Sequence, residues 1–237
     1  VLSYTGSSGS ALHIDSQMNC RYHFGLVVSR SPDPVVLIHP ESEGPDDFVV
    51  VTASVLDFAC AVSSHPEGTS ICLDSSCGPI VNCRLFAEET NSQGTGLHLT
   101  DDSGRGQWIS NNSIEIMYGN QYHGTDQTTG LRLGDPGSQR IVHNRLTQSF
   151  HAPRGAHFDE RTKRYVLGDD VPLQRAVGAE IHAQENELHL SFYGRRPAGQ
   201  DVVFEADSRD NTVFALNLPN GVTSHARVPT NRVVSNR

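Results

Sequence analysis

Short apolar runs separated by turn-forming residues extend over the whole chain, and they constrain the fold more than any other feature of the sequence. Typical runs are residues 24–28, 56–62, 113–118 and 187–193. Turn formers punctuate them, as in Gly134-Asp135-Pro136-Gly137, because such residues set the backbone angles that turns need. Roughly fifteen runs of this kind, spaced by about 8–12 residues, indicate an all-β protein.

Helical periodicity is almost absent. The best helical candidate, residues 171–177, contains Pro172 and is followed by Gly178, so it supports one turn at most. Without helices there are no β–α–β units, and a parallel sheet of the Rossmann type is not expected. The pattern instead predicts an antiparallel β-sandwich, a jelly roll or a barrel-like domain with almost no helix.

The chain is expected to form one all-β domain over residues 1–237. Apolar residues make up 36% of the sequence, which is enough for a substantial core at this length. No repeat period and no low-complexity linker divides the chain. The alternative is two β subdomains that split near residues 149–162, the longest polar gap between predicted strands.

Charge is unevenly distributed along the chain. Residues 1–120 carry a net charge of −10 and residues 121–237 a net charge of +1, for a total of −9. The acidic half would repel a phosphate backbone, so no nucleic-acid partner is predicted. No run approaches the roughly 20 apolar residues that span a bilayer. We therefore expect no membrane span, and an extracellular or virion-surface location rather than a membrane-embedded one.

No cofactor and no metal site is predicted. The cysteines lack the close pairing of structural zinc sites, which favours buried thiols with at most one disulfide among the last three. The His-x-Asp triplets at 13–15 and 157–159 lack the further residues of a non-haem iron site. The acidic pairs at 46–47 and 101–102 do not form an EF-hand. The five cysteines are Cys20, Cys60, Cys72, Cys77 and Cys83.

Several strands alternate apolar and polar residues, which defines the side chains that share a face. Ile114 and Ile116, for example, face away from Glu115. If the polar faces lie on one concave sheet, they line a groove suited to polysaccharide chemistry. Two carboxylates can hydrolyse a glycosidic bond, and Tyr and His can move protons in a lyase. The candidate catalytic residues are Glu115, Glu180, His182, His189, Tyr193 and Glu205.

Two classes of function fit this sequence, and whether the chain is an enzyme stays open. Because no catalytic motif is present, we favour a non-catalytic structural or recognition domain. Such a domain would be a viral capsid or surface domain that binds a glycan or protein receptor and forms a homo-oligomer. The alternative is a carbohydrate-active enzyme, a polysaccharide lyase or glycoside hydrolase, with its groove on the concave face of a β-jelly roll.

Overall fold

The chain folds into stacked coils built almost entirely of parallel strands. The computed structural model describes residues 1–41, 44, 49–119, 129–151, 156–159, 164–167, 176–193, 199–218 and 220–236. The prediction of an all-β protein is confirmed, since helix is limited, in the described ranges, to the 3₁₀ turn η1 (Asp102–Gly104). The prediction of an antiparallel sandwich, jelly roll or barrel is wrong, because all pairs in the three large sheets are parallel.

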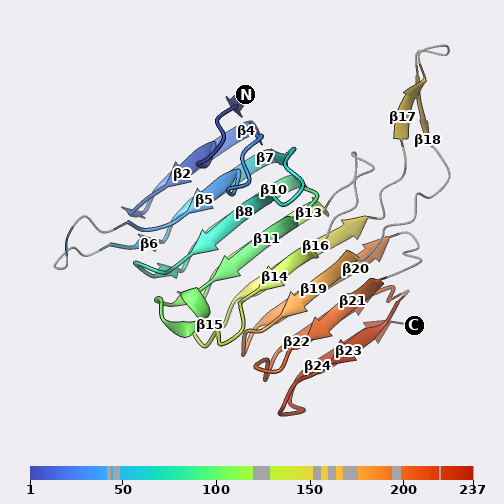
Figure 1. The fold of residues 1–237 in the computed structure, drawn as a ribbon. Helices are drawn as coiled ribbons and strands as arrows, with labels where there is room; N and C mark the ends of the chain where they lie inside the picture. The colour runs from blue at the N-terminus through green and yellow to red at the C-terminus, as the bar shows by residue number, and fades with distance from the viewer. Residues whose placement is uncertain are drawn as a thin grey trace.

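Each large sheet takes one strand from successive coils (Figure 1). Sheet A contains β1 (Leu2–Tyr4), β4 (Arg21–Ser29), β7 (Val55–Ser63), β10 (Arg84–Asn91), β13 (Ser113–Gly119), β16 (Arg145–His151), β20 (Glu187–Tyr193), β22 (Thr212–Leu216) and β24 (Arg232–Asn236). Sheet B contains β2 (Leu12–Ile14), β5 (Val36–Ile38), β8 (Thr69–Asp74), β11 (Thr95–Thr100), β14 (Thr129–Leu133), β19 (Ala176–Ile181), β21 (Gly199–Phe204) and β23 (Val222–Ser224).

Sheet C is short and joins the other two. It contains β3 (Gln17–Met18), β6 (Val51–Thr52), β9 (Ile80–Val81), β12 (Ile109–Ser110) and β15 (Ile141–Val142). Outside these sheets, β17 (Ala156–Asp159) and β18 (Arg164–Leu167) form an antiparallel hairpin, which projects from the stack in Figure 1.

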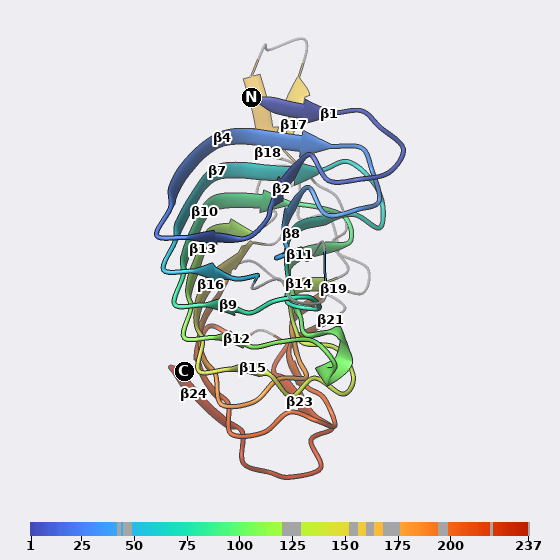
Figure 2. The same cartoon turned by 90° about the vertical axis from the view of Figure 1, so that its left-hand side faces the viewer.

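The path of the chain explains how parallel sheets form without helices. After each strand of sheet A the chain enters sheet B, then sheet C or a connecting loop, and returns to sheet A one coil further on. Figure 2 shows these coils stacked from the N-terminal end to the C-terminal end. A parallel pair needs a crossover connection, and here strands of the other sheets provide it. The architecture is a parallel β-helix.

The corner between sheets C and A has a constant length of two residues in five coils. In each, the sheet C strand is followed by one residue with φ near +55° and by a second residue, after which the sheet A strand begins. The second residues are Cys20, Ser54, Cys83, Asn112 and Asn144. Asn occupies the first position at Asn19, Asn82 and Asn111, where a left-handed backbone is tolerated. Ala53 and His143 adopt the same conformation against the usual steric preference, so the surrounding structure imposes the corner.

A ladder of buried amides connects successive corners. The Asn144 Oδ1 accepts hydrogen bonds from the backbone N of Asn112 at 3.1 Å and from its Nδ2 at 3.0 Å. The Asn144 Nδ2 donates to the Ile109 carbonyl at 2.9 Å and to the Asn186 Oδ1 at 3.0 Å. The rungs from Asn112 to Asn211 each bond to the coil before and the coil after, and Asn231 ends the ladder. The five rungs are Asn112, Asn144, Asn186, Asn211 and Asn231.

The core consists of stacked aliphatic side chains from all three sheets. The predicted inward direction of Ile114 and Ile116 is confirmed, since both are 1% exposed. In sheet A the row that contains Ile114 is formed by Leu56, Leu85, Ile114, Leu146, Leu188 and Val213. Burial of like side chains on top of one another stabilises each coil through its neighbours.

Replacing Asn144 by Ala should destabilise the fold strongly. The change leaves the backbone N of Asn112 and the carbonyl of Ile109 without these bonds inside the helix, and each such loss costs about 1–3 kcal/mol. Urea unfolding monitored by circular dichroism should show a loss of about 3 kcal/mol. The matched control is Asn231→Ala, at a half-buried rung, which should cost about 1 kcal/mol. Equal losses in the two variants would contradict the ladder's role.

Candidate functional site

The outer face of sheet B carries a row of polar side chains in register. His98 on β11 pairs with Arg132 on β14, and Arg132 pairs with Glu180 on β19. The residues that precede them on the three strands, Leu97, Leu131 and Ala179, belong to the core. Strand alternation therefore directs the three polar residues outward. Adjacent strands lie about 4.8 Å apart, so these side chains are within reach of one another.

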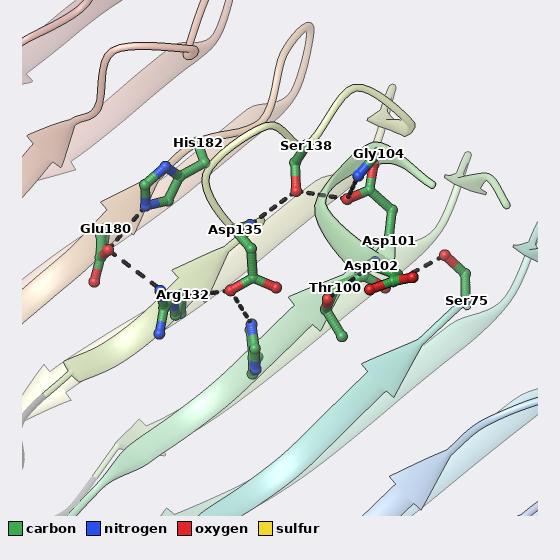
Figure 3. Close-up of polar contacts among 11 residues, drawn as sticks. Ser75, Thr100, Asp101, Asp102, Gly104, Arg132, Asp135, Ser138, Glu180 and His182 are labelled. Atoms are coloured by element: carbon green, nitrogen blue, oxygen red, sulfur yellow. Dashed lines mark hydrogen bonds and ion pairs between the residues drawn. The ribbon is translucent and has the colours of Figure 1, made fainter. Parts of the chain in front are cut away.

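A rigid loop adds a carboxylate to this row. Gly134 leaves β14 with φ of +89°, a conformation that favours glycine. The backbone N of Asp135 donates to the Ser138 Oγ at 2.8 Å, and this hydroxyl donates to the Asp101 Oδ1 at 2.5 Å. Asp101 is fully buried and also accepts bonds from two further loop amides. The loop therefore holds Asp135 in a fixed position (Figure 3).

Five side chains converge here, and we call them the sheet B cluster. The Arg132 Nε lies 3.3 Å from the Asp135 Oδ1 and 3.9 Å from the Glu180 Oε1. Each carboxylate also contacts an imidazole: the His98 Nε2 is 3.2 Å from the Asp135 Oδ1, and the His182 Nε2 is 2.9 Å from the Glu180 Oε1. One guanidinium is thus flanked by two carboxylate–imidazole pairs (Figure 3).

The environment keeps both carboxyl groups ionised. Burial by itself would raise the pKa of Asp135, but hydrogen bonds from His98 and Thr100 and the charge of Arg132 outweigh it and lower the pKa to about 2. For Glu180, the hydrogen bond from His182 lowers the pKa, burial opposes this, and the Arg132 charge adds to the lowering. Neither group is therefore a protonated acid at neutral pH.

Exposure differs among the members of the cluster. The Arg132 side chain is 35% exposed, whereas the His182 side chain is only 7% exposed. The shortest contacts of Arg132 with the two carboxylates are made by its Nε. About a third of its side chain is exposed on the outer face, where it can meet a ligand. Each imidazole contacts its carboxylate through Nε2, so Nδ1 is the other ring nitrogen that can bind or release a proton.

The six residues predicted from the sequence are divided between two sheets. Glu180 and His182 lie together in the sheet B cluster. Glu205 comes directly after β21, and its backbone N donates to the Ile181 carbonyl at 2.9 Å, which places it next to His182 along the sheet. Glu115, His189 and Tyr193 belong to sheet A. The side chain of Tyr193 lies outside the part that the structure describes.

The residues of sheet A form a separate polar and aromatic region on its outer face. The His189 Nε2 is 2.6 Å from the Glu187 Oε1, and its ring stacks on Phe214 with centroids 4.9 Å apart. These rings border a hollow of about 230 Å³. Glu115 pairs with Phe86 and Thr147 on the neighbouring strands, two strands away from His189. The two predicted carboxylates Glu115 and Glu180 therefore do not share a groove.

Three members of the cluster were not among the predicted site residues. His98, Arg132 and Asp135 come from two strands and a loop. The sequence does carry a local signal, because both Leu97-His98-Leu99 and Leu131-Arg132-Leu133 place one polar residue between two core residues. Their adjacency depends on strand order, which the antiparallel prediction did not provide.

Cysteine, metal and membrane features add no further site. All five cysteines are unpaired thiols, and burial raises the pKa of Cys60 to about 12. Among the residues with described positions, no three His, Cys, Asp or Glu side chains gather as metal ligands would. Asp46 and Asp47, and the side chains of His157 and Asp159, lie outside the described part. None of the described helices has the length and apolarity to cross a bilayer.

Comparison of the chain with protein-family models, with curated proteins and with solved structures gave no match.

Asp135→Asn should lower stability in a pH-dependent way. A folded pKa of about 2, below the ordinary value of 3.8, means that the ionised carboxylate stabilises the fold at pH values above about 4, and that this contribution disappears as the pH falls towards 2. We expect the variant to lose about 1–2 kcal/mol at pH 7. Urea unfolding at pH 7, 5 and 3 should show the difference from wild type shrinking at the lowest pH.

The control is Asp102→Asn, which removes an exposed carboxylate 2.6 Å from the Arg105 Nη2. Exposed ion pairs contribute less than about 1 kcal/mol, so this variant should stay close to wild type at each pH. A gap between Asp135→Asn and wild type that is the same at pH 7 and pH 3 would contradict the electrostatic account.

Proposed function

We propose that the chain is a polysaccharide lyase that acts on an acidic, uronate-containing polymer bound along the outer face of sheet B. The observation that carries this proposal is the Arg132 guanidinium with a carboxylate–imidazole pair on each side. A guanidinium is suited to a sugar carboxylate. Imidazoles oriented by carboxylates are suited to moving protons near neutral pH.

The shape of sheet B supports a linear ligand. Its strands lie side by side without interruption from β2 to β23, and their outward side chains repeat every 4.8 Å or so along the stack. A polymer that follows the stack would meet one row of side chains per coil. The loop that carries Asp135 stands at the edge of this face, where it can position a bound sugar unit.

The proposed reaction is a β-elimination. The Arg132 terminal nitrogens neutralise the uronate carboxylate, which acidifies the neighbouring C–H bond. His98, the more exposed imidazole, takes this proton on Nδ1. The C–H electron pair forms a carbon–carbon double bond, the C–O bond to the next sugar breaks, and the Glu180–His182 pair supplies a proton to the leaving oxygen. Atoms and charges balance without a further reactant.

Glycoside hydrolysis fits the cluster less well. Two-carboxylate hydrolases need one carboxyl group with a raised pKa to protonate the leaving oxygen. The pKa values of both Asp135 and Glu180 are lowered, so this role has no carboxyl candidate in the cluster. A recognition domain is the other class of function predicted from the sequence. It would use Arg132 to bind its ligand, but the two oriented imidazoles would have no role in it.

His98→Gln should lower the rate of elimination by about 10²–10⁴-fold, the contribution of a positioned acid or base. The test incubates the protein with uronic and neutral polysaccharides and follows both the ultraviolet absorbance of unsaturated uronate and the release of reducing ends. We expect unsaturated product from uronic polymers only. Reducing ends without unsaturation would identify a hydrolase, and binding without any product would identify a recognition domain; either result would overturn the proposal.

The control variant is His189→Gln. It removes an imidazole that also contacts a glutamate through Nε2, at 2.6 Å, but on sheet A. Its activity should match that of wild type. Equal losses in His98→Gln and His189→Gln would show that the effect does not arise at the sheet B cluster.

A further inference from the structure

A second hollow lies beside the sheet B cluster, on the side of the C-terminal coils. Its volume is about 280 Å³. Its lining includes Gly137, Ser138, Gln184, Asp207, Arg209 and Arg227. They come from the loops that follow the sheet B strands in four successive coils.

One loop, which carries Asp135 and Ser138, contributes to both the hollow and the sheet B cluster. Ser138, which lines the hollow, binds the backbone N of Asp135 at 2.8 Å. On its other side, a Cβ placed on Gly134 would lie 2.9 Å from the Ser138 Cβ and 3.2 Å from the His182 Cβ. Ser138 and His182 therefore flank the same glycine, which places the hollow next to the cluster.

Two arginines give this hollow an excess of positive charge. Arg209 is held by its Nε, which donates to the Gln184 Oε1. Gln184 is in turn fixed by its Nε2, which donates to the Gln139 carbonyl at 2.6 Å. The Arg227 Nη1 lies 3.8 Å from the Asp207 Oδ1, and the Arg227 side chain is 78% exposed.

One oxygen of the Asp207 carboxylate already accepts a hydrogen bond from the protein backbone. Its Oδ2 accepts a hydrogen bond from the backbone N of Gly137 at 3.0 Å, so this carboxylate also steadies the loop that carries Asp135. With two guanidinium groups and one carboxylate among its lining residues, the hollow has a net charge of +1. This balance favours an anionic group and disfavours a cation.

We infer that the hollow is a subsite for the carboxylate of the uronate unit adjacent to the one that reacts, with Arg209 and Arg227 as its ligands. This inference rests on the proposed function and deepens it, because it assigns a direction to the bound polymer. Gln184 and Arg209 are bridge partners in adjacent coils. The polymer therefore extends from the sheet B cluster towards the C-terminal coils and is recognised by charge at a second position.

The test is the double variant Arg209→Gln/Arg227→Gln. With a de-esterified uronic polymer, KM should rise roughly tenfold or more, the cost of losing charge-assisted hydrogen bonds, while kcat stays within about twofold. The methyl-esterified polymer lacks the charge, so wild type and variant should bind it with the same affinity. An unchanged KM on the charged polymer, or an affinity for the esterified polymer that falls as much as that for the charged one, would overturn the inference.

The control for the change in net charge is Arg21→Gln. Arg21 lies on sheet A, is 80% exposed, and makes a similarly long ion pair with Asp57 at 4.0 Å. Its KM should equal that of wild type. Circular dichroism and the urea midpoint establish that each variant is folded.

A direct binding measurement separates this inference from the proposed reaction. Calorimetry with a uronic oligosaccharide should show that His98→Gln binds as wild type does and that the double arginine variant binds at least tenfold more weakly. If wild type shows no turnover but this binding pattern holds, the lyase proposal fails and the subsite stands. If turnover is present but the arginine variant binds normally, the lyase stands and the subsite is wrong.

Discussion

The buried amides at the corner between sheets C and A hold the coils in register, and the other features of the molecule depend on that register. Asn144 bonds to the coil before it and to the coil after it, so sliding its coil by one residue relative to its neighbours would break bonds on both sides. Because the side-chain period of a strand is two, the same one-residue slip would also exchange core and surface. The aliphatic stacks and the outward row on sheet B both follow from this constraint.

The sequence predicts that this fold consists of strands with almost no helix, but it does not predict the order or direction in which the strands pair. Alternation correctly directs Ile114 and Ile116 inward, and the absence of helix is evident from the residues. A two-residue corner with Asn at a left-handed position, as at Asn82 and Asn111, resembles the turn of an antiparallel hairpin. The residues directly before β4, β7, β10, β13, β16, β20, β22 and β24, from Cys20 to Asn231, are 34, 29, 29, 32, 42, 25 and 20 residues apart, so no fixed period marks the coils.

The same limit applies to the sheet B cluster. Glu180 and His182 are two residues apart on one strand, so alternation alone places them on one face. Arg132 and His98 join them only through the order of β11, β14 and β19. Asp135 joins through a loop whose position depends on the buried Asp101 and Ser138. Contacts of this kind require the strand order, which local patterns do not contain.

The constant corner and the variable connections together define where this scaffold accepts new sequence. The connection between β16 and β19 is longer than the others, and it contains the hairpin β17–β18, which lies outside the coils. In the corners after β3, β6, β9, β12 and β15 it always uses two residues. A protein engineer could therefore exchange loops beside sheet B to alter ligand preference. One residue added at a corner would instead displace a ladder position and turn the next strand inside out.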